Sequence, residues 1–197
     1  MIKRFFDLTV ASAGLILASP VLLTVAALVR LLTGPPVFFK QARMGKGGRR
    51  FTLIKFRTMA VSPGAEKKDF EPGNLNRVTP LGRFLRRSKL DEWPQLFNVI
   101  RGDMSLVGPR PEVPEWIEAY PDRWVIVLGV RPGITDPAAL VYRREELILG
   151  GAADPEKTYR DEILPHKLAL YEDYIRRRNF FVDIAIIMKT VFSLFRA

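Results

Sequence analysis

The first pattern along the chain is a long apolar segment near its beginning. No charged residue occurs between Leu8 and Val29. A helix of that length would reach about 33 Å, enough to cross a hydrocarbon core of about 30 Å. A single transmembrane anchor is therefore one interpretation. A cleaved signal peptide fits less well, because the apolar stretch exceeds the usual length of about 7–15 residues.

A proline in the middle of this segment favours a bent helix that enters and leaves on one face. Pro20 lacks a backbone N–H and biases Ser19 away from helical geometry. In lipid, the carbonyl that loses its donor needs a partner, which a serine hydroxyl can help to supply. Each arm is then only about 18 Å long. Basic residues flank both ends, which favours the cytoplasm for both: Lys3, Arg4, Arg30 and Lys40. We expect residues 1–36 to form a re-entrant helix–break–helix, with a kinked spanning helix as the alternative.

The following residues predict a β-hairpin and two helices. Residues 37–59 read as two strands around a turn at Gly45–Gly48, and residues 61–78 as a polar loop. A helix is expected to start after Thr79, because proline suits a first turn, and a second one covers residues 90–100. Seven basic residues and no acids lie between Lys40 and Arg57. That composition suits a solvated face as well as a surface for phosphates or lipid headgroups.

The second half of the chain predicts mainly helices. Residues 111–124 have helical spacing, residues 131–137 form a rigid turn, and residues 156–178 form a charged helix interrupted at Pro165. Residues 179–196 are apolar with a sparse polar side, typical of an interfacial helix or of a buried core helix. The expected fold class is α+β and mostly helical. Residues 37–197 would form a second, compact domain with a small hairpin and interfacial amphipathic helices.

Composition narrows the classes of partner. The 197 residues carry a formal net charge of +10, which points to a polyanionic partner such as nucleic acid, anionic lipid or a phosphorylated metabolite. The apolar segment and the lack of a basic–aromatic recognition motif argue against nucleic acid. There is no cysteine, which excludes disulfides, thiolate metal sites and cysteine nucleophiles. A single histidine, His166, argues against a Ser-His-Asp triad.

Two adjacent carboxylates, Asp91 and Glu92, lie within an arginine-rich stretch that runs from Arg83 to Arg110. Carboxylates bind Mg²⁺ and can attack phosphorus, and arginine forks match phosphate oxygens. The stretch therefore predicts a pocket for a metal and a phosphorylated substrate. Spacing alone also allows an acidic start to a helix, favoured by the helix dipole.

Several segments together resemble the bacterial sugar transferases, which are monotopic phosphoglycosyl transferases that load polyprenol phosphate. The segments are Lys55–Met59, Leu81–Arg87, Leu90–Val99, Gly102–Pro111 and Arg131–Thr135. Ser19 and Pro20 match the break in the re-entrant membrane helix of that family. The resemblance covers roughly residues 2–192, and its central motif is long and specific.

The resemblance implies a two-step exchange at the cytoplasmic face of the bacterial inner membrane. A UDP-sugar gives its phosphosugar to an enzyme carboxylate and releases UMP. Polyprenol phosphate then takes the phosphosugar, as the first membrane step of exopolysaccharide or glycoconjugate synthesis. Mg²⁺ is the implied cofactor. The implied partners are the donor, the acceptor and membrane lipids but no nucleic acid, and a homodimer is compatible with the resemblance.

The resemblance also assigns roles to residues. Asp91 maps onto the nucleophile and onto a ligand of Mg²⁺, and Glu92 onto the residue that deprotonates the acceptor or helps to organise the metal. The expected phosphate and substrate ligands are Arg86, Arg110, Lys55, Arg57, Gln95 and Arg131. The intact carboxylates and arginines argue against the alternative of a non-catalytic membrane-bound relative.

The sequence departs from the family pattern at two places. Trp93 stands where the family usually has leucine, at the expected rim of the pocket. Asp136 follows Thr135 where many members have glycine. Because this second region is expected to face the donor, the departure bears on which sugar is bound.

Overall fold

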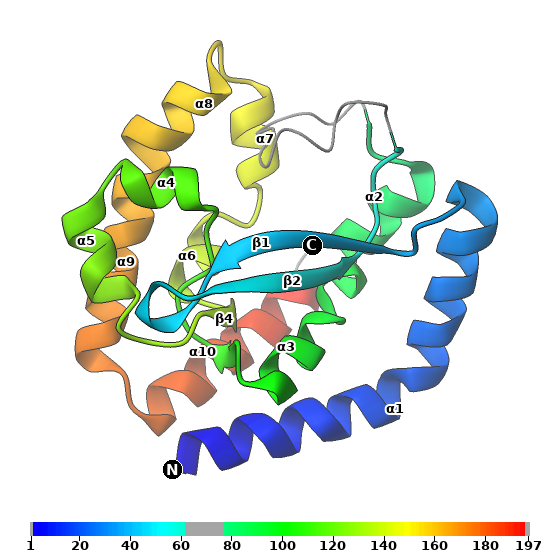
Figure 1. Ribbon diagram of the computed structural model, residues 1–197, viewed down its shortest axis with the longest axis horizontal. Coiled ribbons are helices and arrows are strands. Elements are labelled where there is room, and N and C mark those ends of the chain that lie inside the picture. Colours follow the sequence, from blue (N-terminus) through cyan, green and yellow to red (C-terminus); the bar gives the residue numbers. More distant parts are fainter. Residues whose placement is uncertain (1, 62–76, 196–197) are drawn as a thin grey trace.

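The structure is a computed structural model that describes residues 2–61 and 77–195 (Figure 1). Helix α1 (Ile2–Thr33) leads to a hairpin of β1 (Phe38–Met44) and β2 (Arg50–Phe56), joined by the short helix η1 (Lys46–Gly48). Next come α2 (Pro80–Arg87), the 3-10 helix η3 (Leu90–Glu92), α3 (Gln95–Arg101) and β3 (Ser105–Val107). The second half contains α4 (Pro114–Glu118), α5 (Pro121–Val127), β4 (Gly133–Thr135), α6 (Pro137–Val141), α7 (Glu145–Gly150), α8 (Pro155–Thr158), the π-helical turn η4 (Tyr159–Ile163), α9 (Leu164–Arg177) and α10 (Phe180–Phe195).

The predicted fold class, a mostly helical protein with a small antiparallel hairpin, is confirmed. Strands β1 and β2 pair from Phe38 opposite Phe56 to Met44 opposite Arg50. A second sheet was not expected: β3 and β4 pair in parallel, with Ser105 opposite Gly133. The prediction of a rigid turn over residues 131–137 was therefore incomplete, because a three-residue strand between prolines gives no alternating pattern. The loop predicted for residues 61–78 lies mostly outside the described residues.

Helix α1 remains helical through Pro20, so the expected break is a bend within one continuous helix (Figure 1). Proline at this position removes the hydrogen bond to the carbonyl of Ile16, four residues earlier. The Ser19 hydroxyl donates to that same carbonyl at 2.7 Å. The serine thus replaces the donor that the proline lacks, which explains why the helix continues.

The two arms of α1 pack against different hydrophobic clusters. The first arm contributes Ala11 to a cluster that also includes Val99, Met104 and Ile186. The second arm contributes Val25 and Val29 to a cluster with Phe56 of β2 and Leu85 of α2. The bend at Pro20 therefore lets one helix follow two sides of the domain.

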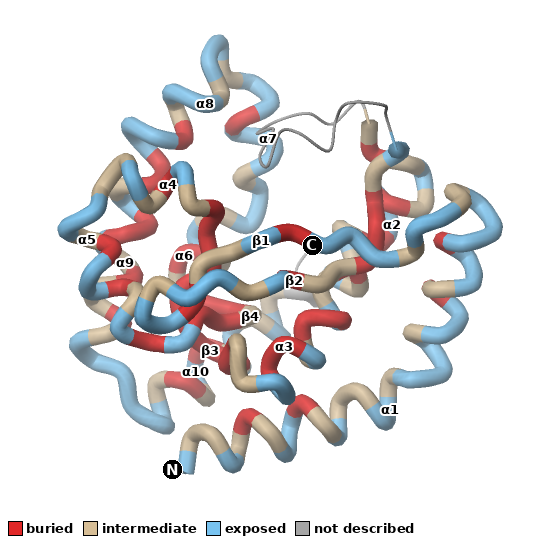
Figure 2. The backbone as a smooth tube through the Cα atoms, in the orientation of Figure 1, coloured by how far each residue is buried: buried red, intermediate tan, exposed pale blue. Residues whose placement is uncertain are grey.

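Much of the remaining α1 surface is apolar and exposed (Figure 2). Leu17, Leu23 and Leu31 are 81%, 70% and 80% exposed. The helix is long and apolar enough to cross a membrane by length and composition. Helix α10 also exposes apolar side chains, with Phe181 at 82%, while its Asp183 is buried. Exposed apolar area of this extent marks a surface that meets lipid or a partner, and a membrane association of the protein is consistent with it.

Three helix predictions need correction at their boundaries. Residues 90–100 divide into η3 and α3, and residues 111–124 into α4 and α5, which begin at Pro114 and Pro121. Each division falls at a proline, which cannot donate to the preceding turn but fits a first turn. By contrast, Pro165 does not interrupt the long helix; it lies in the first turn of α9, directly after the π-helical turn η4.

Helix α2 approaches the chain after β2 so closely that only glycine fits at the contact. A Cβ atom on Gly82 would lie 2.0 Å from the carbonyl oxygen of Thr58. We expect Gly82→Ala to lower the free energy of unfolding by about 1–3 kcal/mol, because the backbones must separate. Thermal unfolding in detergent would show this. Gly151→Ala is the matched control, since its Cβ would meet nothing closer than 3.6 Å. Equal unfolding midpoints for the two variants would contradict the close approach.

Candidate active site

The paired carboxylates lie in η3, directly after a sharp change of chain direction. Lys89 has a φ of 58°, the left-handed conformation, and it separates α2 from η3. Few residues other than glycine and asparagine adopt this conformation without cost. The turn brings Asp91 into a buried position, with 7% of the residue exposed. Glu92 faces a different set of neighbours.

Glu92 joins three parts of the chain through one oxygen. Its Oε1 accepts hydrogen bonds from Nζ of Lys55 and from Nη2 of Arg110, each at 2.9 Å. Lys55 comes from β2, and Arg110 comes from the segment after β3. Burial alone would raise the pKa of Glu92, but these two cations hold it well below its ordinary value. Glu92 is therefore an ionised, fixed anion.

Asp91 has the opposite electrostatic environment. Burial, and after it the negative charge of Glu92, raises the pKa of Asp91 to about 6. Its Oδ1 is buried and has no hydrogen-bond partner among the described residues. Buried polar atoms without partners are rare in proteins, and one at such a site indicates a role toward a ligand. This carboxylate oxygen is available to bind a cation or to attack an electrophile.

Arg86 lies on α2, on the approach to this pair. Its Nε donates to Oγ1 of Thr58 at 2.9 Å, and its Nη1 donates to Oε1 of Glu146 at 3.0 Å. The positive charge of Arg86 opposes the rise in the pKa of Asp91. Glu146 is an exposed residue of α7, so this pair is worth little and a phosphate could replace its carboxylate. Arg86 thus lies near enough to the buried carboxylate to influence its charge, and its role as a phosphate ligand stays a prediction.

The remaining predicted ligands do not all gather here. Arg57 is buried, and its Nη atoms donate to the carbonyls of Thr33, Gly34 and Pro35 at the end of α1. In the structure this guanidinium closes the end of α1. A phosphate role for Arg57 would require it to leave three carbonyl oxygens.

Gln95 and Arg131 occupy two further environments. Gln95 begins α3 and is 2% exposed, and its Nε2 has no hydrogen-bond partner among the described residues. Arg131 is exposed, donates to the carbonyl of Gly102 at 2.9 Å, and lines a separate cavity near the start of α1. The structure therefore brings Lys55, Arg86 and Arg110 to the carboxylates but places Arg131 elsewhere.

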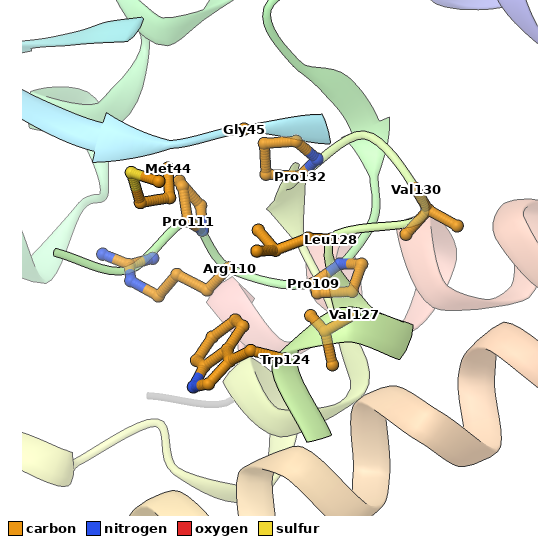
Figure 3. A pocket seen from close by; sticks show the side chains of 10 residues that line it. All are labelled: Met44, Gly45, Pro109, Arg110, Pro111, Trp124, Val127, Leu128, Val130 and Pro132. Atoms are coloured by element: carbon orange, nitrogen blue, oxygen red, sulfur yellow. The ribbon is translucent and has the colours of Figure 1, made fainter. Parts of the chain in front are cut away.

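A hydrophobic wall supports Arg110. Its aliphatic stem lies among the side chains of a small hollow, and Figure 3 shows the guanidinium pointing away from them. The lining includes Pro109, Pro111, Trp124 and Leu128. A stem held in this way directs the charged group toward Glu92 at little cost in side-chain freedom.

A buried polar layer near Arg110 was not expected from the sequence. Asp136 is 1% exposed, and burial raises its pKa to about 6 against the charges of Arg110 and Lys167. One of its oxygens accepts from the N–H of Ala139, and the other has no partner among the described residues. The hydroxyl of Tyr171 is likewise buried without a described partner. The only signal for this layer was the departure at Asp136, since its members are far apart in the sequence.

The site and the fold define a class. Paired carboxylates with perturbed pKa values, set among cations and joined to a long exposed apolar helix, are typical of an enzyme that handles phosphorylated substrates at a membrane. Comparison with known proteins gives the family. The chain belongs to the bacterial sugar transferase family, whose profile matches residues 1–197.

Named relatives agree with this assignment. The chain is 38% identical to the uncharacterized sugar transferase EpsL of Bacillus subtilis, over 97% of this chain and 86% of that protein. It is 34% identical to the exopolysaccharide production protein ExoY of Rhizobium meliloti, over 97% and 84%. It is also 36% identical to a UDP-N-acetylgalactosamine-undecaprenyl-phosphate N-acetylgalactosaminephosphotransferase of Aeromonas hydrophila, over 96% of this chain but only 43% of that protein. The protein is accordingly a sugar-phosphate transferase.

The raised pKa of Asp91 predicts the acidic limb of the activity profile. The carboxylate is charged, and so able to bind a cation or attack phosphorus, only above a pH of about 6. Transfer activity should therefore rise with pH through about 6. In Glu92→Gln the neighbouring negative charge is gone, so the pKa of Asp91 falls and the limb moves to lower pH. Initial rates measured between pH 5 and 8 would test this.

A matched control is Glu146→Gln, which removes an exposed carboxylate that is paired with Arg86. Its acidic limb should stay where the wild type has it. A limb that is the same in Glu92→Gln and in the wild type would contradict the coupling between the two carboxylates.

Proposed function

We propose that the protein transfers a phosphosugar from a UDP-sugar to polyprenol phosphate through a covalent intermediate on Asp91. The observation that supports this most is the buried Oδ1 of Asp91, which has no described partner and lies beside a cation cluster. A structural carboxylate in such a place would normally be hydrogen-bonded. A nucleophile needs one oxygen free.

In the first step, an oxygen of Asp91 attacks the phosphorus that carries the sugar. The new O–P bond forms as the bond from that phosphorus to the bridging oxygen breaks, and UMP leaves with the electron pair. The attack brings a negative oxygen to a negative diphosphate, so cations must screen the approach. Arg86 and Arg110 lie near the carboxylate pair and remain charged at any working pH.

In the second step, an oxygen of polyprenol phosphate attacks the same phosphorus. The bond between Asp91 and phosphorus breaks, which restores the carboxylate and yields a lipid diphosphate sugar. Glu92 is ionised and fixed by Lys55 and Arg110. We assign it the role of holding these cations in place beside the acceptor phosphate. Splitting the reaction in two allows a soluble donor and a membrane acceptor to react in turn.

The carboxylates of the site can bind Mg²⁺ if the phosphates of the substrate supply further ligands. In the described part of the chain no group of three or more histidine, aspartate or glutamate side chains could hold a metal by itself. Mg²⁺ commonly binds one or two carboxylates together with substrate phosphates. The carboxylate of Asp91 is the available protein ligand, since Glu92 already accepts hydrogen bonds from two cations. When bound, the ion would neutralise charge that develops on the phosphate oxygens.

The location at the cytoplasmic face of the bacterial inner membrane is part of the proposal. The bend at Pro20 and the basic residues at both ends of α1 support a re-entrant arrangement. The exposed apolar faces of α1 and α10 support contact of both helices with lipid. In that arrangement the carboxylates lie at the membrane surface, where a polyprenol phosphate can reach them.

The covalent intermediate can be trapped in the absence of acceptor. Purified protein, Mg²⁺ and a panel of UDP-sugars should give a phosphosugar adduct that intact-mass spectrometry detects, together with one equivalent of UMP. Asp91→Asn should give no adduct, because the amide is not a nucleophile. The panel would include the donors in relatives' names, UDP-N-acetylgalactosamine and UDP-glucose.

Glu92→Gln is the matched control, because it also replaces a carboxylate by an amide, at the neighbouring residue. We expect it to form the adduct at a reduced rate and to transfer it poorly. If Asp91→Asn formed lipid-linked product at the wild-type rate, the covalent mechanism would be wrong. The phosphosugar would then pass directly from the donor to the acceptor. A wild type that binds donor but forms neither adduct nor product would indicate a non-catalytic relative.

Labelling of introduced cysteines tests the topology, and the chain has no native cysteine to interfere. Ile2→Cys and Lys40→Cys place thiols at exposed positions before and after the apolar segment. In sealed inverted membrane vesicles both should react with an impermeant maleimide, because both ends of α1 face the cytoplasm. Reaction of only one of the two would make α1 a true transmembrane span.

A further inference from the structure

A second cationic site lies at the beginning of α1. It is a cavity of about 200 Å³, room for several water molecules at about 30 Å³ each. The start of α1, the hairpin turn, the start of β3, the residues before β4 and the end of α9 all line it. Its basic side chains are Lys3, Arg4, Lys46, Arg131 and Arg178.

The carboxylates around this cavity have hydrogen-bond partners of their own. Asp7 accepts hydrogen bonds from the hydroxyl of Ser105 at 2.7 Å and from the N–H of Leu106. Asp183 accepts from Lys3 and from the hydroxyl of Tyr174. Among the basic side chains of the cavity, Lys3 is therefore paired with Asp183. Arg4 donates hydrogen bonds to carbonyl oxygens at the end of α3.

The other cations have no acidic partner in the part of the chain that the structure describes. This holds for Lys46 and Arg178, and Arg131 uses only its Nε, which donates to the carbonyl of Gly102. Three positive charges from three separate elements thus surround one cavity, and the carboxylate that lines it, Asp7, is held by the hydroxyl of Ser105 and the N–H of Leu106. Such an excess of positive charge attracts an anionic ligand.

The site is separate from the paired carboxylates. Lys46 lies in the hairpin turn, whereas Lys55 lies near the open end of the same hairpin. At about 3.4 Å per residue, β2 alone carries the chain about 17 Å from Arg50 to Lys55. A single phosphate therefore cannot contact both sites.

The geometry points to a second phosphate-binding site at this cavity, which takes an anionic phosphate group from a lipid headgroup or from solution. Its position favours the lipid source, because the cavity lies at the N-terminal end of the apolar helix (Figure 1). Basic pockets beside membrane helices bind anionic headgroups in this way. Such a site would hold the start of α1 at the membrane surface while the paired carboxylates remain free for substrate.

Native mass spectrometry of the full chain in neutral detergent tests the site directly. The probes are short-chain phosphatidylglycerol, short-chain phosphatidylcholine and inorganic phosphate. The wild type should retain phosphatidylglycerol in preference to phosphatidylcholine. Lys46→Gln combined with Arg178→Gln should reduce that retention by about thirtyfold, because two charges near the headgroup are lost.

The matched control removes two charges from the same elements but outside the cavity, with Arg49→Gln combined with Arg177→Gln. It should retain the lipid as the wild type does. Lys46→Arg keeps the charge and should also retain it, which separates loss of binding from loss of folding. Retention by Asp91→Asn should equal that of the wild type, so this outcome does not depend on the proposed transfer reaction.

The other outcomes are equally informative. Retention of inorganic phosphate without phosphatidylglycerol would support the phosphate site but assign it to a soluble anion. Equal losses in the two double variants, or a wild type that prefers neither phosphate nor phosphatidylglycerol over phosphatidylcholine, would overturn the proposal.

Discussion

The arrangement of the site depends on the carboxylate of Glu92, which binds one cation from the hairpin and another from the segment after β3. Both bonds are 2.9 Å long and end on the same oxygen. Lys55 and Glu92 are 17% and 13% exposed at their side chains, so water screens their attraction only partly. Removing one partner from a buried pair costs about 3–5 kcal/mol, whereas an exposed pair contributes about 0–1 kcal/mol. Glu92 therefore fixes the distance between the hairpin and the segment that carries Arg110.

This arrangement gives two adjacent carboxylates opposite properties. Glu92 takes the direct contacts with the cations, and its pKa is held well below the ordinary value. Asp91 is buried and lies next to the negative charge of Glu92, so its pKa is raised to about 6. Two carboxylates whose environments separate their pKa values are suited to different roles in one reaction. Because the cations lie on Glu92, one oxygen of Asp91 keeps no described partner.

The sequence predicted those parts of the fold whose signals are local. The hairpin and the start of α2 after Thr79 follow from neighbouring residues, and the choice of Asp91 with Glu92 as candidates rests on the same kind of signal. The parallel pair β3–β4 is too short to show a pattern, and its pairing depends on glycines. A Cβ on Gly133 would lie 2.1 Å from the N–H of Gly108. The contacts of Arg57 were not predictable for a related reason, since a motif shows that an arginine is needed but not which oxygens it contacts.

The bend in α1 connects the course of this helix to the geometry of the site. The second arm packs Val25 and Val29 against Phe56 and Leu85. Phe56 directly follows Lys55 in the sequence, and Leu85 directly precedes Arg86. Arg57 closes the end of the same arm through three carbonyl oxygens. A shift of this arm would therefore move the strand and the helix that supply two of the cations. Because proteins pack their interiors densely, such a shift is transmitted and not absorbed. The same contacts that set how the helix lies thus also set where the cations meet the carboxylates.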